Sequence, residues 1–321
     1  MKALILFCLS LILTLVSGIG KNKKLFILIY HRVLDEPDYM RVGEVDKESF
    51  TWQMALLEKY FNVLSLSDAL EKMQSDKLPA RAVCITFDDG YADNYLNALP
   101  ILKQFNLKAT FFIANGYLNG GIMWNDKVIE AVRLMTSQQL DLNEFKLGVF
   151  DIKDEKDKLL AAQQIILKIK HLEANKRQKI ADNIASRVNN MPTELMLADN
   201  QLVQLYQSGM EIGGHTVTHP IISNLKDDAL EKELHDNKTF LEKLLKTKLK
   251  FFAYPNGKPN IDYKMNQIEL VKKMQYQAAV STEWGVSNKM SDYFQLQRFT
   301  PWDKDSIRFM LRIVLNYFYR K

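Results

Sequence analysis

Two carboxylates and two imidazoles stand in the sequence at spacings that could bind a cation and move a proton. Asp88 and Asp89 follow the apolar run 82–87 in AVCITFDDG, and His215 and His219 lie four positions apart in EIGGHTVTHP. Burying a strand is favourable, whereas burying two unpaired carboxylates is costly. Neighbouring residues at a strand end point in different directions. One carboxylate can therefore bind a cation while the other accepts a proton.

The spacing of the histidines decides whether they can share an ion. In an extended strand the two imidazoles would lie about 13 Å apart, but in one helical turn they stack on the same face. Gly213 and Gly214 let the chain turn sharply, and Pro220 discourages a helix from continuing past His219. We therefore expect one bent turn that carries both rings, and the alternative is an ordinary core helix. Two histidines and one carboxylate make a three-ligand catalytic zinc site with an open position for water.

Strand-like and helix-like segments alternate along most of the chain, and these elements must position the four side chains. Phe50, Met54, Leu57 and Phe61 recur at the spacing of a helix face. The strand candidates are 25–33, 62–67, 81–87, 109–115, 210–215, 250–257 and 276–282. Such alternation predicts parallel strands with helices outside, in either a barrel or a doubly wound sheet. The segment after Gly90 has helical spacing, so the acid pair is expected on a strand-to-helix loop, at the edge of the sheet where ligands bind.

One block, residues 119–200, interrupts this alternation. It contains no convincing strand, and its segment 156–188 is helical and rich in lysine. We expect a helical insertion that follows the strand 109–115. Because loops after barrel strands open on the face where ligands bind, the insertion could act as a lid or a substrate wall, and the alternative is a decorated outer surface.

The N-terminal segment MKALILFCLSLILTLVSGIG has the layout of a secretory signal. It has one lysine, an apolar run over 3–16, and small residues that allow cleavage after Gly18 or Gly20. The run is short for a membrane span, which needs about 20 apolar residues. The basic residues KNKK that follow weaken the usual orientation signal, so an uncleaved anchor is the alternative. Residues 1–20 therefore predict a secreted, periplasmic or cell-envelope protein, with membrane association through this segment if the leader is retained.

The composition excludes several classes of protein. Of the 321 residues, 47% are hydrophobic and 25% are charged, which suits a globular chain rather than a disordered one. The net charge of +5 is spread out without an arginine-rich stripe, so no nucleic-acid partner is expected. Cys8 would leave with a cleaved leader, and Cys84 would then be alone, so no intramolecular disulfide is expected.

Three motifs carry a resemblance to a known family. TFDDG (86–90), HTVTHP (215–220) and FAYPNG (252–257), in that order, resemble the first three motifs of the polysaccharide deacetylases of carbohydrate esterase family 4. The resemblance covers about residues 25–300. It implies an α/β fold, a distorted (β/α) TIM-like barrel of the NodB homology type, with the helical insertion at about 119–200. With YHRV near its start and no late histidine, the chain resembles most the deacetylases of exopolysaccharide and poly-N-acetylglucosamine systems.

The resemblance implies a role for each motif residue. Asp88 would be the general base, and Asp89, His215 and His219 would bind Zn²⁺, with another divalent transition metal as the alternative. The ion would act as a Lewis acid on the acetamido carbonyl and lower the pKa of its bound water. The backbone N–H of Asn256 would stabilise the oxyanion, and protonation of the leaving amine would give acetate and a free glucosamine.

Three features depart from the family pattern. One is Asn256, which follows Pro255 in place of an aromatic residue, although a backbone donor there survives any side chain. Many members carry an arginine two residues before the third-motif proline, where it orients the base, but this chain has Ala253. Arg298 in LQRFTP could supply that charge from another strand end. Many members also have a late catalytic histidine, whereas no histidine follows His235. A closed barrel brings its first and last strands together, so His31 in IYHRV is the candidate general acid, with a structural strand-end residue as the alternative.

Five residues are candidates for binding the substrate: Tyr254, Pro255, Trp124, Trp284 and Arg298. Sugars stack on indole faces, so Trp124 is expected as an exposed platform, and its alternative role is to anchor the insertion. Trp284 is expected to line the acetyl pocket. The final apolar helix is expected to pack on the barrel, and contact with a membrane surface is the alternative.

The expected function is that of a zinc-dependent hydrolase with one catalytic domain at 21–321. It would remove N-acetyl groups from an N-acetylglucosamine-containing polysaccharide, either an exopolysaccharide or a cell-envelope glycan. One alternative is an O-deacetylase of an acetylated glycan, which would use the same residues. Another is a catalytically decayed carbohydrate-binding protein, which the missing arginine favours and the intact base and metal ligands oppose. A glycosidase is disfavoured, because no second acidic pair stands out as suited to flank a glycosidic bond.

Overall fold

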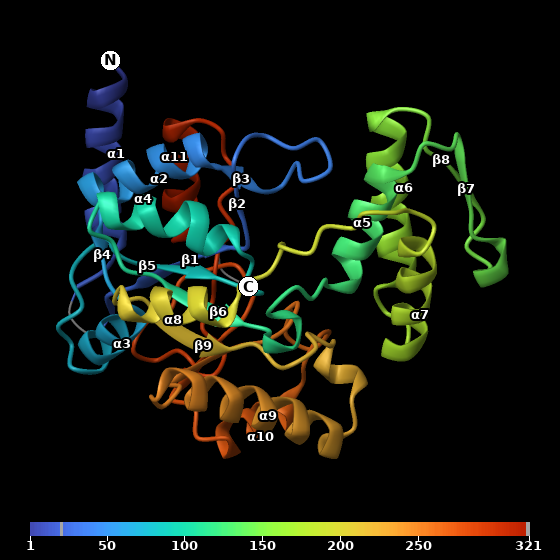
Figure 1. The fold of residues 1–321 in the computed structure, drawn as a ribbon. Coiled ribbons are helices and arrows are strands. Elements are labelled where there is room, and N and C mark those ends of the chain that lie inside the picture. The colour runs from blue at the N-terminus through green and yellow to red at the C-terminus, as the bar shows by residue number, and fades with distance from the viewer. Residues whose placement is uncertain (20–21, 319–321) are drawn as a thin grey trace. The chain divides into compact units, whose positions relative to one another are not determined.

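The computed structural model describes residues 1–19 and 22–318 of the chain. Two compact units, each with its own hydrophobic core, are present (Figure 1). The first contains Met1–Glu36, Glu44–Leu118 and Leu197–Lys321, and the second contains Pro37–Gly43 and Asn119–Met196. The cleavage position predicted after Gly20 and the last residues of the predicted final helix lie outside the described residues.

A curled sheet of parallel strands forms the centre of the first unit (Figure 1). Its strands, in spatial order, are β1 (Leu25–Tyr30), β5 (Ala82–Phe87), β6 (Thr110–Ile113), β9 (Glu211–Gly214), β10 (Phe251–Ala253) and β11 (Ala278–Val280), and β4 (Asn62–Val63) pairs with β5 off this path. The predicted parallel pairing is confirmed. β1 and β5 are buried along their whole length, which explains why both read as continuous apolar runs.

Residues 296–299 link the two edges of this sheet. Leu296 pairs in parallel with Val280 of β11, and Phe299 pairs in parallel with Leu28 of β1. Two backbone hydrogen bonds of 2.9 Å join Phe299 to β1. The first and last strands are thereby brought together. Of the two predicted architectures, the barrel type is correct and the doubly wound sheet is not.

Helices cover the sheet, and three of them begin at a capping side chain. They are α2 (Lys47–Tyr60), α3 (Leu66–Gln74), α4 (Leu99–Gln104), α8 (Asp199–Gln207), α9 (Asp227–Leu245), α10 (Met265–Lys273) and α11 (Ser306–Asn316), with 3-10 turns at Asn115–Tyr117 and Ile222–Asn224. The Asp46 carboxylate accepts from the Ser49 N–H at the start of α2. The predicted helix face is confirmed, because Phe50, Met54 and Leu57 of α2 are fully buried.

Two irregular features flank the ends of β1 and β5. The short strands β2 (Val33–Leu34) and β3 (Val45–Asp46) pair in parallel. A π-helical stretch, Asn94–Ala98, precedes α4. Pro100 stands in the first turn of α4, so the break predicted at this proline falls close to a junction between two helix types.

An N-terminal helix, α1 (Lys2–Val16), lies against α11. Its inner face is made of buried leucines that join the main core: Leu6, Leu9 and Leu13. α11 buries Phe309 and Met310 completely, so the predicted packing of the final helix on the barrel is confirmed. Within residues 1–19 and 22–318, no helix combines the length and the hydropathy that crossing a bilayer requires.

The second unit is built from α5 (Trp124–Leu134), α6 (Glu155–Ile169), α7 (Ala174–Ala185) and a hairpin of β7 (Gln139–Asp141) and β8 (Val149–Asp151), with a 3-10 turn at Asn143–Phe145. The expectation of no strand between 119 and 200 was therefore wrong. Each strand has three residues and buries only its central side chain, Leu140 or Phe150, which is too little to form an apolar strand pattern. The helical prediction for 156–188 is confirmed in outline by α6 and α7.

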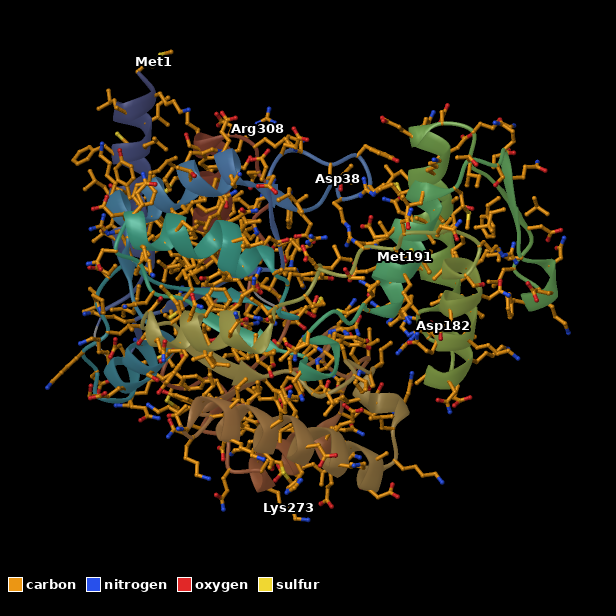
Figure 2. The ribbon with its side chains drawn as sticks, viewed as in Figure 1. Met1, Asp38, Asp182, Met191, Lys273 and Arg308 are labelled. Carbon is orange, nitrogen blue, oxygen red and sulfur yellow. The ribbon has the colours of Figure 1, made fainter. Side chains whose placement is uncertain are left out.

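Ion pairs hold the segment Pro37–Gly43 against α5. Arg41 Nη1 lies 2.7 Å from Asp126 Oδ1, and both side chains are buried. Asp38, which is labelled in Figure 2, lies 2.6 Å from Arg133. Removing one partner of a buried pair strongly destabilises a protein. This segment, which comes from the connection between β2 and β3, therefore belongs structurally to the second unit.

Candidate active site

The side chains that were predicted to bind a metal or to transfer protons come directly after the carboxyl ends of neighbouring strands. His31 comes after β1, Asp88 and Asp89 come after β5, and His215 comes after β9. β1 and β5 end in register, and the Asp88 N–H donates to the Tyr30 carbonyl at 3.0 Å. Because parallel strands end at the same edge of a sheet, four residues that are far apart in the sequence meet there.

Backbone geometry at the end of β5 turns the two acids in different directions. Asp89 has a φ of +76° and Gly90 a φ of +92°. The first is unusual for a residue with a side chain, and such conformations cluster at functional sites. The Asp89 carbonyl accepts from the Ala114 N–H at 3.2 Å, which ties the turn to the end of β6. Asp88 and Asp89 are both buried, with 3% and 6% exposure.

Asp89, His215 and His219 converge on one point. Nε2 of His215 and Nε2 of His219 each lie 3.4 Å from Asp89 Oδ1. The three ligand atoms lie within 4.8 Å of one another. Among the described residues, Asp89 Oδ1 is buried without a hydrogen-bond partner, which is costly for a carboxylate oxygen unless a cation satisfies it. Two imidazoles and one carboxylate are the donor set of catalytic zinc sites, so these residues fit a divalent transition metal.

A second hydrogen bond fixes the tautomer of His215. Its Nδ1 lies 2.7 Å from the Ala253 carbonyl, which can only accept, so Nδ1 carries the proton. Nε2 is then left with a free lone pair on the side of Asp89. A ligand histidine oriented by a carbonyl through its other nitrogen is the usual arrangement in metal sites.

The local charges favour the ionisation states that ligands need. Burial lowers the pKa of His219 to about 4, although the nearby Asp89 carboxylate acts to raise it. His219 is therefore neutral at pH 7. Burial alone would raise the pKa of Asp89, but the neighbouring imidazoles of His219 and His215 hold that pKa well below its usual range. A neutral imidazole and an ionised carboxylate are the metal-binding forms.

Asp88 does not join this cluster but pairs with Arg298. Nη1 and Nη2 of Arg298 donate to the two oxygens of Asp88, at 2.7 Å each. Burial alone would raise the pKa of Asp88, but the Arg298 charge lowers it, so the carboxylate is ionised. Arg298 also donates to Thr86 Oγ1 at 3.1 Å and to the Ser281 carbonyl at 2.9 Å. Asp88 Oδ2 lies 4.0 Å from Nε2 of His215, so an oriented carboxylate stands beside the metal ligands.

His31 is half-buried, and the negative charges of Asp88 and Asp89 act on its imidazole. Its carbonyl accepts from Asn94 Nδ2 at 2.8 Å, which holds the backbone at the end of β1. Burial acts to lower the pKa of His31, but the carboxylates of Asp89, Glu44 and Asp88 outweigh it and raise the pKa. The imidazolium form, which can donate a proton, therefore persists to higher pH than for a free histidine.

The loop after β10 carries the third motif. Asn256 has a φ of +59°, and its carbonyl accepts from Thr282 Oγ1 at 2.7 Å. Within the described part of the chain, the Asn256 N–H has no hydrogen-bond partner. Pro255 is buried and accepts from the Gly257 N–H at 2.7 Å. A fixed backbone donor is thus available in this loop.

The Tyr254 side chain differs from its expected place in a substrate pocket. It is fully buried, and its ring stacks on Tyr263 with centroids 3.9 Å apart. The Tyr254 ring is therefore part of the main core, where stacking on a second aromatic ring stabilises it. Only the backbone of Tyr254 belongs to the loop that carries Asn256.

The two candidate tryptophans have different surroundings. Trp284 is 40% exposed and lies next to Trp302 and Phe299, with ring centroids 5.0 and 5.7 Å away. Trp124 is only 7% exposed and lies in the core of the second unit, with the Arg177 guanidinium 4.8 Å from its ring. The expected exposed platform at Trp124 is therefore corrected. The apolar faces of α5 and α7 meet at this point, and the position suits the alternative role, anchoring the insertion.

Three contacts at the site involve residues that were not singled out from the sequence. Thr86 and Ser281 hold Arg298, and Asn94 holds the His31 backbone. Thr86 and Asn94 lie in the conspicuous stretch TFDDGYADN, so a local signal for them existed. Ser281 lies in no motif, and only the register between β11 and residues 296–299 brings it to Arg298.

Comparison with known proteins agrees with this geometry. The family model described as polysaccharide deacetylase matches residues 75–142 and 169–279, more than half of the chain. The chain is 26% identical over 207 residues to the poly-beta-1,6-N-acetyl-D-glucosamine N-deacetylase of Staphylococcus aureus (strain MSSA476), which is 63% of this chain and 71% of that protein. It is 23% identical over 280 residues to YxkH of Bacillus subtilis (strain 168), which is 87% of this chain and 71% of that protein.

A solved structure shares the fold. The Streptococcus pyogenes deacetylase PplD in complex with acetate superposes with a TM-score of 0.61 and 21% identity, over 90% of this chain and 97% of that chain. The predicted barrel of the NodB type is thereby confirmed, as is the resemblance on which it rested. The chain belongs to the polysaccharide deacetylase family.

Proposed function

We propose that the protein is a metal-dependent N-deacetylase that acts on a polysaccharide containing N-acetylglucosamine, either an exopolysaccharide or a cell-envelope glycan. One observation carries the proposal: an ionised, oriented carboxylate at Asp88 stands beside the convergent ligands Asp89, His215 and His219. The N-deacetylase named among the relatives supports the choice of an acetamido sugar over other acetylated groups.

Asp89, His215 and His219 would hold a zinc ion. When bound, the ion would supply Lewis acidity toward the acetamido carbonyl and make water a competent nucleophile near neutral pH. The orphan oxygen Oδ1 of Asp89 and the free Nε2 of His215 support this assignment.

Asp88 takes the proton of the attacking water. Arg298 uses one lone pair on each carboxylate oxygen, and each oxygen keeps another for the incoming proton. The backbone N–H of Asn256 donates to the oxygen that gains negative charge. His31, as the imidazolium, protonates the leaving nitrogen as the carbon–nitrogen bond breaks. Water is consumed, and acetate and a free amine on the sugar result.

We also propose that the chain acts outside the cytoplasm. Residues 1–20 have the layout of a secretory leader, which would be removed or would remain as an anchor. N-terminal sequencing of the protein recovered from the cell envelope and from the medium would distinguish the two forms. Recovery of the protein only in the cytoplasm, with its leader intact, would refute the localisation.

The deciding experiment is acetate release from acetylated glucosamine oligomers by protein stripped of metal and then given zinc. Asp88→Asn is assayed beside it, and Asp35→Asn at an exposed surface position is the matched control. Zinc-restored release that Asp88→Asn slows by at least about 100-fold and that Asp35→Asn retains would establish the activity. Release from an acetate ester but from no acetamido oligomer would instead assign an O-deacetylase. Zinc binding without release from either substrate would refute the enzyme function.

A further inference from the structure

The loop between the two histidine ligands, residues 216–218, adopts an uncommon backbone conformation. Thr216 has a φ of +64°, and His219 has a φ of +49°. Left-handed conformations at residues with side chains persist only where the surroundings enforce them. Part of the support is local, because Thr216 Oγ1 accepts from the His219 N–H at 3.1 Å, and the rest comes from outside the loop.

Among the described residues, Glu233 of α9 is the side chain that makes the most hydrogen bonds with this loop. Its Oε2 accepts from the Val217 N–H at 2.7 Å and from the Thr218 N–H at 2.9 Å. Its Oε1 accepts from the Thr218 hydroxyl at 2.7 Å. Successive backbone N–H groups that converge in this way form an anion-binding concavity, and here a carboxylate of the same chain fills it.

The Thr216 carbonyl accepts from Asn237 Nδ2 of α9 at 2.7 Å, whereas the other two carbonyl groups of the loop are satisfied from the turn after β6. The Val217 carbonyl accepts from the Gly116 N–H at 2.9 Å, and the Thr218 carbonyl accepts from the Tyr117 hydroxyl at 2.8 Å. A Cβ on Gly116 would approach the Val217 oxygen to 2.6 Å, so this close contact requires glycine. The loop is thus held between the turn after β6 and α9. At Val217 and Thr218, the hydrogen bonds to α9 are made by Glu233.

The two ligand rings differ in how they are oriented. His215 follows β9 directly and is fixed by the bond from its Nδ1 to the Ala253 carbonyl. Within the described residues, His219 Nδ1 has no hydrogen bond of this kind. The orientation of the His219 ring must therefore come from its backbone, and hence from the loop.

We propose that Glu233 is a positioning residue of the metal site: by binding the 217–218 amides, its carboxylate holds the His219 imidazole against Asp89 and His215. The proposal rests on the metal-binding part of the proposed function. It assigns to α9 a role in preparing the site before the ion arrives, and no contact with substrate. Partners outside the ligand shell commonly contribute a factor of about 10 to 100 in metal affinity.

Zinc affinity tests this role without reference to activity. Zinc dissociation constants of metal-free wild type, Glu233→Gln and Glu233→Ala are measured by competition with a chromophoric chelator. Glu231→Gln is the matched control, because Glu231 lies on the same helix and pairs with Lys273 at the surface. We expect Glu233→Ala to bind zinc about 10 to 100 times more weakly than wild type. Glu233→Gln should lie between them, because one amide oxygen can still accept from the loop, and the control should match wild type.

Further readouts separate positioning from a general structural role. The visible spectrum of the cobalt-substituted protein should change in Glu233→Gln, because it reports ligand geometry, while the melting temperature of the metal-free protein stays near that of wild type. Unchanged zinc affinity in both variants would overturn the proposal, as would a lower melting temperature with unchanged affinity. If Glu233→Ala fails to fold, Glu233→Gln decides. Failure of the wild type to bind zinc would refute the metal site itself, whereas loss of the Glu233 effect alone would leave the proposed function standing.

Discussion

Arg298 donates to both carboxylate oxygens of Asp88, at 2.7 Å each, although 210 positions separate the two residues in the sequence. The guanidinium is completely buried, and its Nε is held by the Ser281 carbonyl. A bidentate pair of this kind fixes direction as well as charge. Asp88 is therefore presented as an oriented and ionised base, which is the state that general-base chemistry requires.

Replacing Arg298 should lower the rate and shift its pH dependence. Arg298→Lys keeps the charge but loses the paired geometry, and misplacing a catalytic group by about 1 Å can cost about 100-fold in rate. Because the pKa of Asp88 is lowered in the folded protein, activity is lost as the pH falls through that pKa. A weaker cationic partner raises the pKa and moves the acid limb of kcat/KM to higher pH. The pH–rate profile measures this shift.

Arg312→Lys is the matched control, because Arg312 makes a similar two-point pair with Asp303 outside the site. It should leave the acid limb unchanged. An Arg298→Lys enzyme with an unaltered acid limb would show that Asp88 does not depend on this guanidinium.

The sequence allowed the sheet and the position of the site to be predicted because both depend on local patterns. Continuous apolar runs marked β1 and β5, and polar residues placed directly after strand ends marked the edge where ligands bind. The hairpin of β7 and β8 could not be predicted in this way, since each strand buries one side chain only. The burial of Trp124 also depends on how α5 packs in the second unit, which the sequence around it does not encode visibly.

Contacts that depend on long-range register were harder to anticipate. The reach of Arg298 to Asp88 requires residues 296–299 to lie between β11 and β1, and no local pattern marks those four residues as a strand. Glu233 reads as one of many charges on a helix, and only the tertiary packing of α9 shows that it binds the histidine loop. Motif residues could therefore be identified from the sequence, whereas most of the residues that orient them could not.

Replacing each of the two acids of the DDG motif should have a different effect on zinc binding and on acetate release. Asp89→Asn removes a ligand charge and should weaken zinc binding by more than about 100-fold, beyond the range seen for outer partners. Asp88→Asn should bind zinc nearly as wild type but release acetate about 10² to 10⁴ times more slowly, the usual contribution of a general base. Zinc titration and acetate release on the same preparations measure both effects. Equal zinc affinities in the two variants would contradict the division of roles.

His219 should make the metal-free protein less stable in mild acid. Its pKa is about 4 in the folded protein because of burial, against about 6.5 when unfolded. Between these values the unfolded state binds the proton more strongly, so the free energy of unfolding falls as the pH is lowered through this window, by up to about 3 kcal/mol. Urea unfolding at pH 7, 5 and 4 measures the slope. His219→Gln should show a shallower slope, and an identical slope in the variant would contradict this source of acid sensitivity.

Replacing Trp284 should affect substrate binding, whereas replacing Trp124 should affect the stability of the fold. Trp284 is 40% exposed, and its loss should raise KM for acetylated oligosaccharides by about 3- to 10-fold, the equivalent of one aromatic contact. Trp124→Ala should instead lower the free energy of unfolding by about 3–5 kcal/mol, as expected for a large buried ring. Steady-state kinetics and chemical denaturation of both variants give the comparison. A raised KM in Trp124→Ala at unchanged stability would return that residue to the substrate site.

Loss of the proton from His31 should set the alkaline limb of the pH–rate profile. Burial acts to lower its pKa, but the carboxylates of Asp89, Glu44 and Asp88 raise it overall, so the proton-donating form persists to higher pH than in a free histidine. Activity should then fall as the pH rises through this raised pKa. His31→Gln should lose about 10² in kcat and lose that alkaline limb, with zinc affinity unchanged, because it removes the acid and no ligand. His235→Gln, at an exposed position on α9, is the control and should match wild type. Retention of the alkaline limb in His31→Gln would mean that another group protonates the leaving nitrogen and that His31 only supports the end of β1.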